Sequence, residues 1–275
     1  MLIVDAHVHI HDRFRLDRLF WSTHQNLSSA AVSFQPAKGF NGILLLTESR
    51  KANCFATLTS MAKGKRVHPE AYTGRWRVSL TGEDVSLRVH HEDQGEFFVV
   101  AGRQVVTAEK LEVLALFVAK PIKDGDPIRE VITQVEGLGG QPVLPWGFGK
   151  WTGRRGAVLE HLLNGAGHRM FCLGDNGGRP HFLPEPRQFR LAREAGTKIL
   201  PGSDPLPFST EESRIGSFGC YIDAEVSLSR PAGDLKRIFQ TPGVVIRRYG
   251  KLETPLRFIR NQVKMQLWKR NWIAN

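Results

Sequence analysis

The stretch at residues 2–12 constrains the fold more than any other part of the chain. Residues 2–4 are apolar, which is typical of a short buried strand. His7 and His9 follow one residue apart, and alternate residues of an extended backbone point to the same side. Both imidazoles should therefore face one way at the carboxyl end of the strand. Imidazole is the commonest metal ligand, so the pair indicates a zinc, manganese or iron site. The alternative is a pair of half-buried strand histidines.

The rest of the chain alternates between apolar runs and helical patterns. This alternation predicts parallel strands with functional groups in the loops at their carboxyl ends. Residues 75–100 differ, because short β-rich runs are separated there by turn residues, which is typical of hairpins. We therefore predict an α/β fold over one domain, 1–275. The expected architecture is a distorted parallel, TIM-like β/α barrel with an inserted antiparallel segment at about 75–100. The expected helices are 13–24, 53–62, 127–138, 157–163 and 186–195, and the expected strands outside that segment are 2–4, 42–47, 103–107, 111–118, 142–145, 169–173 and 198–200.

The charge of the chain favours an anionic partner. There are 38 Lys and Arg against 27 Asp and Glu, which gives a formal net charge of +11. Nucleic acid is disfavoured because the basic residues form short clusters without interleaved aromatic residues, so we expect a small anionic substrate. The three cysteines are far apart, which fits a reducing cytoplasm. We also expect no signal peptide and no membrane span, since apolar runs such as 113–119 fall far short of roughly 20 residues.

Polar side chains follow three of the apolar runs. They are His7 with His9, then Glu48, and then Asp204. The carboxyl ends of parallel barrel strands converge on one face, so these groups should meet there. A carboxylate beside two imidazoles can complete a metal site and can orient or deprotonate its water.

Two of these motifs carry a resemblance to a known family. Asp5-Ala6-His7-Val8-His9 resembles the opening Asp-x-His-x-His of the polymerase and histidinol phosphatase (PHP) family of metal-dependent phosphoesterases, which belongs among the amidohydrolase-like barrels. Gly202-Ser203-Asp204 resembles the Gly-Ser-Asp-x-His of that family. The similarity extends from residue 2 to about 208 and includes weaker matches at 42–49, 100–107, 111–116 and 139–143. It implies a PHP-type barrel.

The resemblance also implies a metal site with fewer ligands than the family has. His7, His9 and Asp204 match ligand positions, Asp12 could stand for an early aspartate, with Asp17 as the other possibility, and Glu112 replaces a histidine. Other ligand positions hold residues that cannot serve in the same way, namely Ser49, Gln104, Trp146 and Leu206. We therefore expect one divalent ion (Zn, Mn or Fe) on His7, His9 and Asp204, with Glu112 or Glu48 in addition.

The function that follows is a metal-dependent hydrolase, and the resemblance favours a phosphoesterase with a reduced metal site. One alternative is an amidohydrolase-type enzyme acting on lactones or amides. Gly202-Ser203-Asp204-Pro205 also resembles the last barrel strand of those enzymes, where Asp204 would be the catalytic general base. The other alternative is a barrel that has lost catalysis and serves as a binding module.

Several residues near predicted strand ends are candidates for substrate binding. The turn from Gly174 to Arg179 could cradle an anion with backbone amides and the Arg179 guanidinium, and His181 could reach the site from the rim. Lys150 and Arg154 follow another strand end and could hold a phosphate, and we place Gln104 in the same group. The simpler explanations are a polar turn and solvated charges.

The C-terminal segment, about 255–272, predicts a basic amphipathic helix with Pro255 in its first turn. One apolar stripe suffices to dock such a helix, and a second stripe then needs a second subunit, a protein partner or an anionic membrane. We expect the second, tryptophan-rich stripe to be the free one. That would allow a cytoplasmic protein peripheral to the membrane. The alternative is that both stripes are buried within one chain. The stripes are Leu256, Ile259, Val263 and Leu267, and, nearly opposite, Phe258, Met265, Trp268 and Trp272.

Overall fold

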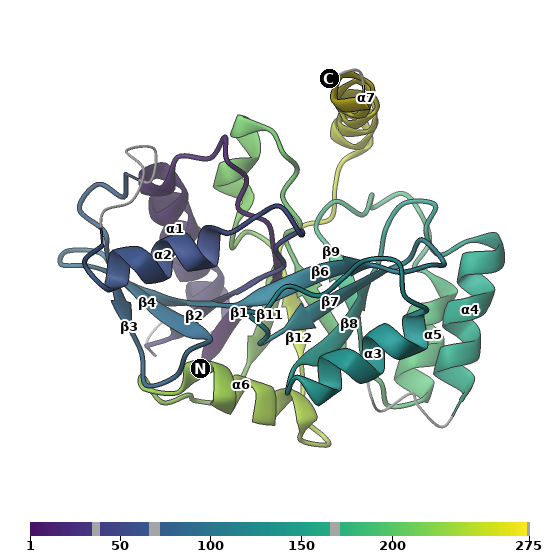
Figure 1. Ribbon diagram of the computed structural model, residues 1–275, viewed down its shortest axis with the longest axis horizontal. Coiled ribbons are helices and arrows are strands. Elements are labelled where there is room, and N and C mark those ends of the chain that lie inside the picture. The colour runs from purple at the N-terminus through teal and green to yellow at the C-terminus, as the bar shows by residue number, and fades with distance from the viewer. Residues whose placement is uncertain (35–38, 66–71, 166–170, 274–275) are drawn as a thin grey trace.

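The computed structural model describes residues 1–34, 39–65, 72–165 and 171–273. It contains two mixed β-sheets with helices on their outer faces (Figure 1). The first sheet has seven strands in the order β12-β11-β1-β2-β5-β4-β3, of which β1, β2 and β5 are parallel. Its strands are β1 (Leu2–Val8), β2 (Asn41–Leu46), β3 (Arg77–Leu80), β4 (Ser86–His91), β5 (Gly95–Val100), β11 (Gly219–Ile222) and β12 (Arg247–Tyr249).

The second sheet has five strands in the order β10-β9-β8-β7-β6. Strands β8, β9 and β10 run parallel, whereas β7 is antiparallel to both β6 and β8. Its strands are β6 (Gly102–Val106), β7 (Glu112–Leu116), β8 (Gln141–Pro145), β9 (Cys172–Asn176) and β10 (Ile199–Gly202).

The helices cover the outer faces of the two sheets. Helices α1 and α2 pack on the first sheet, α3 to α5 pack on the second, and α6 closes the core between the sheets. This explains the apolar runs, since Ile3 packs under α1 while Leu2 and Val4 face the second sheet, so β1 is buried on both sides. The helices are α1 (Leu16–Phe34), α2 (Cys54–Ala62), α3 (Ile128–Gly137), α4 (Gly153–Asn164), α5 (Arg187–Glu194), α6 (Pro231–Gln240) and α7 (Pro255–Ile273), with a 3-10 helix η3 (Ser209–Arg214).

The predicted closed barrel, TIM-like or PHP-type, is wrong. A barrel of the expected kind would need β1 and β2 to offer their outer edges to the strands of the second sheet. Instead, β11 pairs antiparallel with the outer edge of β1, and β5 pairs with the outer edge of β2. Strand β5 is paired in turn with β4, and β4 with β3, in antiparallel hairpins. Because β11 pairs with Leu2–Val4 of β1 and β5 pairs with β2 over Gly42–Leu45, the strands form two separate sheets and not one closed ring.

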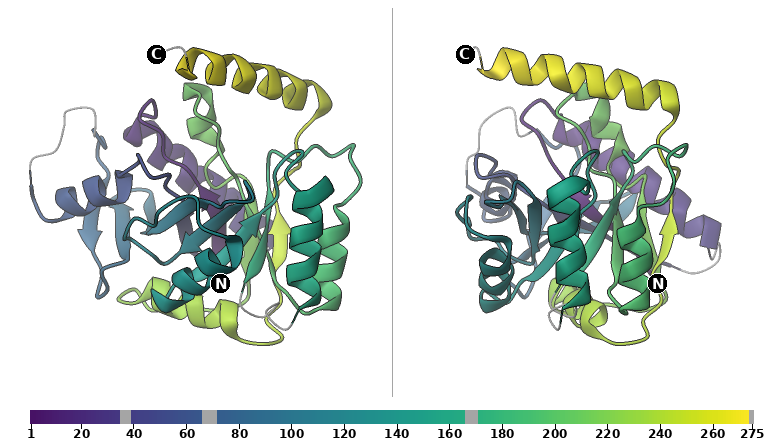
Figure 2. Two further views of the ribbon diagram at one scale, coloured as in Figure 1. Left: turned by 45° about the vertical axis from the view of Figure 1, so that its right-hand side comes forward. Right: turned by 90° about the vertical axis from the view of Figure 1, so that its right-hand side faces the viewer.

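The two sheets nevertheless meet at the carboxyl ends of their strands. There the backbone N–H of Asp204, beyond β10, donates to the carbonyl of His7 over 2.8 Å. On the other side of β1, Glu48 forms an isolated parallel bridge with Arg103 of β6. Helix α7 lies across this end of the molecule, away from the N-terminus (Figure 2). Among the described residues, no helix combines the length and apolar character needed to span a bilayer.

Candidate metal centre

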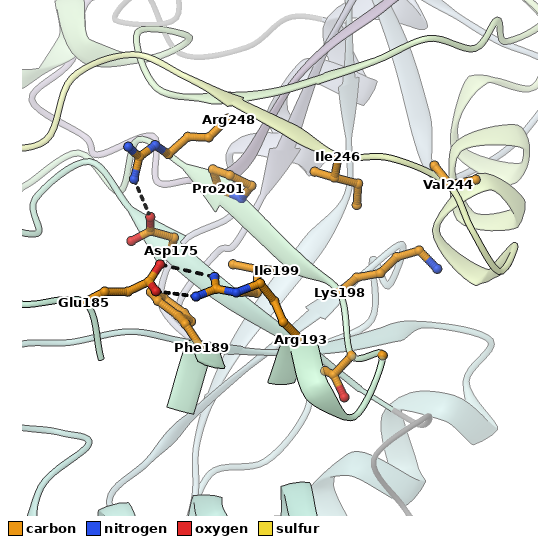
Figure 3. A pocket seen from close by; sticks show the side chains of 12 residues that line it. Asp175, Glu185, Phe189, Arg193, Lys198, Ile199, Pro201, Val244, Ile246 and Arg248 are labelled. Carbon is orange, nitrogen blue, oxygen red and sulfur yellow. Dashed lines mark hydrogen bonds and ion pairs between the residues drawn. The ribbon is translucent and has the colours of Figure 1, made fainter. Parts of the chain in front are cut away.

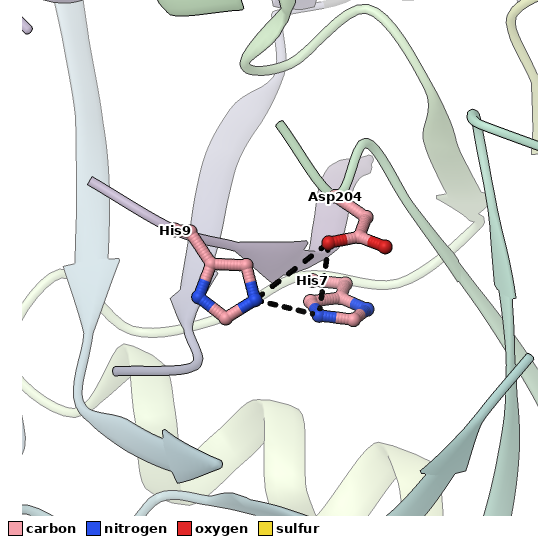
Figure 4. Close-up of side chains that lie close together, drawn as sticks. All are labelled: His7, His9 and Asp204. Carbon is pink, nitrogen blue, oxygen red and sulfur yellow. Dashed lines mark hydrogen bonds and ion pairs between the residues drawn. The ribbon is translucent and has the colours of Figure 1, made fainter. Parts of the chain in front are cut away.

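Three side chains converge at the meeting point of the two sheets. His7 lies at the end of β1, His9 follows it on the same side, and Asp204 follows β10 (Figure 4). The Nε2 atoms of the two histidines are 3.1 Å apart. Oδ1 of Asp204 lies 3.5 Å from Nε2 of His7 and 3.6 Å from Nε2 of His9. The intervening Val8 is fully buried in the core. The alternation predicted from the sequence therefore brings both imidazoles to the carboxylate.

The triangle of ligand atoms has the dimensions of a metal site. Zinc binds imidazole nitrogen and carboxylate oxygen at roughly 2.0–2.2 Å, so two ligands of a tetrahedral ion lie about 3.3 Å apart. The three separations described above bracket this value. Two imidazoles and one carboxylate are also the protein ligands of catalytic zinc sites and of non-haem iron sites, which leave further positions open. Among the described residues, these three form the one group whose donor atoms could share an ion.

The protonation states also fit metal binding. Burial first, and then the neighbouring His7, lower the pKa of His9 to about 3, so its imidazole is neutral near pH 7. For Asp204, burial alone would raise the pKa, but the imidazoles of His7 and His9 and the ammonium of Lys150 hold it below its ordinary value. A neutral imidazole and an ionised carboxylate are the forms that bind a metal.

Asp204 is held in place by its own backbone and by Asn176. Its φ of 46° lies in the left-handed region, which aspartate tolerates better than most residues. The side-chain amide of Asn176 donates to Oδ2 of Asp204 over 2.9 Å and to the carbonyl of Trp146 over 2.9 Å. Both bonds fix the carboxylate so that Oδ1 faces the histidines. The sequence placed Asn176 only within the candidate anion-binding turn from Gly174 to Arg179, and its contact with Asp204 was not predicted.

Asp5 stabilises the site without joining it. Its carboxylate is fully buried and accepts backbone N–H groups of Ser203 and Gly216 at 2.8 Å each and of His7 at 3.3 Å. Burial raises the pKa of Asp5 and these hydrogen bonds offset part of that rise, which leaves the pKa at about 6. Asp5 therefore ties β1 to the segment after β10.

Gly202 allows the two strands to approach each other. A Cβ atom at this position would lie 2.2 Å from the backbone nitrogen of His7 and 2.5 Å from its Cβ, far inside contact distance. Both neighbours are rigid, so only glycine permits β10 to pass β1 this closely. The glycine of the Gly202-Ser203-Asp204 motif thus has a direct role in placing Asp204 beside His7.

The structure does not bring the other three expected metal ligands into this cluster. Asp12 is exposed on the turn after β1. The carboxylate of Glu48 is buried, lies 3.1 Å from Nη1 of Arg103 and accepts the N–H of Phe55 at the start of α2. Glu112 forms an ion pair with Lys150. The buried Glu48 therefore joins the sheets and holds α2.

Lys150 is the expected substrate-binding residue whose charge reaches the metal cluster. Its ammonium, paired with Glu112, contributes to lowering the pKa of both Asp204 and His9. Arg154 is exposed in the first turn of α4. Gln104 is half-buried on β6, where its backbone N–H donates to the carbonyl of Glu48. No hydrogen bond or ion pair found among the described residues links Arg154 or the side chain of Gln104 to the cluster.

The arginine of the turn after β9 is not available to bind an anion. Arg179 is buried, and its guanidinium donates two hydrogen bonds, of 2.7 and 2.9 Å, to the carboxylate of Asp175. Its charge is therefore already neutralised inside the protein. His181 is exposed, and its backbone N–H donates to the carbonyl of Glu253. This turn connects to the segment before α7 rather than to the histidines.

A cavity of about 600 Å³ lies beside β10, α5 and β12 (Figure 3). Arg193 in its wall bonds to Glu185 over 3.2 Å, and Arg248 lies 3.4 Å from a carboxylate oxygen of Asp175. Its two arginines are thus paired with carboxylates, and none of the three metal-cluster residues lines it. The cavity adds nothing to the candidate metal centre.

Comparison with known proteins adds support for the fold. No family model matches the chain, and no curated protein matches it. The crystal structure of PsfC from Pseudomonas syringae PB-5123 is similar over 98% of both chains, with a TM-score of 0.54 and 15% sequence identity. At this identity the likeness concerns the arrangement of the chain alone. The α/β architecture with two mixed sheets is therefore one that a solved structure shares.

Proposed function

We propose that this protein is a metal-dependent hydrolase that uses one divalent ion and acts on phosphate esters. The observation that carries the proposal is the triangle formed by His7, His9 and Asp204, whose edges of 3.1, 3.5 and 3.6 Å suit one shared ion. When bound there, the ion would polarise a phosphoryl oxygen and lower the pKa of a water.

The residues of the chain have distinct parts in this proposal. His7 and His9 offer two imidazole nitrogens from one strand, and Asp204 brings the single negative charge of the ligand set. Asn176 holds the far oxygen of that carboxylate, so the near oxygen stays aimed at the histidines. A divalent ion with one carboxylate keeps a positive charge, which attracts an anionic substrate.

Lys150 supports a phosphate rather than a neutral substrate. Its ammonium is half-exposed, pairs with Glu112 and adds positive charge beside Asp204. A substrate phosphate can compete with Glu112 for this ammonium as it enters, and a lysine is a common point-charge partner for phosphate. The resemblance of the Asp5–His9 and Gly202–Asp204 segments to the PHP motifs supports the same chemistry.

The test uses protein stripped with a chelator and reloaded with manganese, zinc or iron. Hydrolysis of p-nitrophenyl phosphate and of a phosphodiester should appear with metal and disappear in His9→Ala. Lys150→Gln should raise KM for these esters more than it lowers kcat. His161→Ala, an exposed histidine on α4, is the matched control and should leave activity unchanged.

The alternatives from the sequence give different results in the same experiment. If the metal-loaded protein hydrolyses lactones or amides but no phosphate ester, it is an amidohydrolase-type enzyme with Asp204 as general base. Metal binding without hydrolysis on either panel would indicate a binding module. If the protein binds none of the three metals, the proposal fails altogether.

A further inference from the structure

Helix α7 exposes a continuous stripe of aliphatic side chains along its outer face. The four residues fall on an arc of about 80° at 100° per residue, so they form one face of the helix. Large apolar residues such as Trp21 and Val32 are also exposed elsewhere on the described surface, and single exposed residues of this kind are normal for a protein surface. The stripe is Leu256 (84% exposed), Ile259 (57%), Val263 (53%) and Leu267 (54%).

The sequence interpretation had assigned the two stripes of this helix the other way round. Phe258 of the aromatic stripe is buried, and its ring packs at 5.0 Å from that of Phe148 and 6.1 Å from that of Phe182. Met265 and Trp268 are half-buried, while the side chain of Trp272 is outside the described part. The aromatic rings fill the gap between α7 and the body of the protein, so it is the aliphatic stripe that is left outside.

The helix is fixed to the body by buried charges. Arg257 lies 3.1 Å from a carboxylate oxygen of Glu211 and 3.4 Å from one of Glu253, and both glutamates are buried. Arg214 joins them by an ion pair of 2.5 Å to Glu253. The aliphatic stripe is therefore displayed at a fixed orientation, across the end of the molecule where β1 and β10 terminate (Figure 2).

The charges of α7 indicate what covers the stripe. The helix sequence has no acidic residue, and Arg260 and Lys264 are exposed beside the stripe. Two copies packed face to face would bring these cations together, which opposes self-association. A nucleic acid would satisfy the cations but would offer nothing to four aliphatic side chains. An anionic bilayer surface suits both, because acyl chains accept the stripe and lipid phosphates accept the cations. The five basic residues of the helix are Arg257, Arg260, Lys264, Lys269 and Arg270.

We propose that α7 binds the surface of anionic membranes, with its aliphatic stripe in the boundary between headgroups and acyl chains. The helix would lie in the plane of that boundary, as amphipathic interfacial helices do. Because α7 lies over the carboxyl ends of the strands, the candidate metal centre would be near the membrane. The membrane proposal does not depend on the hydrolase proposal.

The test is co-sedimentation of the full chain with phosphatidylcholine vesicles and with vesicles that also contain phosphatidylglycerol. The parent protein should bind the anionic vesicles, and binding should weaken with added salt. Ile259→Ser/Val263→Ser should reduce the partition coefficient at least about tenfold. Arg260→Gln/Lys264→Gln should reduce it about fivefold for each charge on anionic vesicles.

The matched control is Leu80→Ser/Leu228→Ser, which removes two leucines of similar exposure, 50% and 52%, far from α7 in the sequence. This variant should bind as the parent does. The proposal is overturned if the parent ignores anionic vesicles or if the Ile259/Val263 variant binds unchanged. It is also overturned if light scattering shows a parent dimer that the same variant makes monomeric, since a second copy would then cover the stripe. Circular dichroism of each variant checks that the fold is intact.

Discussion

Replacing Gly202 by alanine should separate the two strands that carry the candidate metal ligands. The added Cβ would lie 2.2 Å from the backbone nitrogen of His7, whereas ordinary contact begins at 3.4 Å, so the strands must move apart by about 1.2 Å. The same shift lengthens the 2.8 Å hydrogen bond from Asp204 to the carbonyl of His7 beyond bonding distance. It also strains the 2.8 Å bond from Ser203 to Asp5.

The cost of Gly202→Ala can be bounded from these contacts. Overpacking in a rigid setting costs about 1–3 kcal/mol, and each lost hydrogen bond adds about 1 kcal/mol. The free energy of unfolding should therefore fall by about 3–5 kcal/mol, a large part of the roughly 5–15 kcal/mol available to a typical protein. Affinity for the divalent ion should fall as well, because Asp204 moves away from the histidines.

Urea unfolding and metal titration measure the two effects. Gly137→Ala is the matched control, because a Cβ at Gly137, in the last turn of α3, meets no atom within 4 Å. That variant should be neutral or more stable by about 0.5–1 kcal/mol, with unchanged metal affinity. A Gly202→Ala protein within about 0.5 kcal/mol of the parent, and with the same metal affinity, would refute the close approach of β1 and β10.

Three further predictions follow from the site. Asn176→Ala should weaken metal affinity about 10–100-fold with the fold intact, measured by competition with a chelating dye; equal affinity would mean that Asn176 does not orient Asp204. Glu48→Gln should lower the free energy of unfolding by about 3 kcal/mol, because it leaves Arg103 buried without its partner, yet leave metal stoichiometry unchanged. Metal at about 100 times its Kd should raise Tm by roughly 5–10 °C in a differential scanning experiment, and it should not do so in His9→Ala or when excess chelator is present.

The sequence could predict the three clustered residues because each depends on local rules. The period of two in a strand fixes His7 and His9 on one side, and a polar residue after an apolar run marks a strand end. Asp204 is positioned in the same way by the strand that precedes it. The carboxyl ends of β1 and β10 lie side by side even though the predicted barrel does not form.

The sheet topology could not be read from the sequence, because strand partners are chosen by tertiary packing. Residues 219–222 and 247–249 form β11 and β12, short strands that no periodicity revealed, and β11 takes the edge of β1 that a barrel would need. The carboxylate of Glu48 illustrates the same limit. Its position after an apolar run predicts a metal ligand. In the structure it instead forms an ion pair with Arg103, which is more than fifty residues away in sequence.

The two stripes of the C-terminal helix show how partner surfaces limit sequence interpretation. Both stripes are apolar enough to dock, and the sequence alone does not indicate which one meets the body. The rings of Phe148 and Phe182 decide it, since they provide an aromatic surface that fits Phe258. The exposed position of Leu256 and its neighbours follows from that pairing.

X-ray absorption at the metal edge of the zinc-loaded protein examines the candidate centre itself. If His7, His9 and Asp204 hold the ion, the spectrum should show one ion per chain with two imidazole ligands at roughly 2.0–2.1 Å and oxygen completing the shell. The His9→Ala protein should lose one imidazole or the ion. A parent spectrum with oxygen ligands alone, or a protein that retains no ion, would contradict the proposed metal centre.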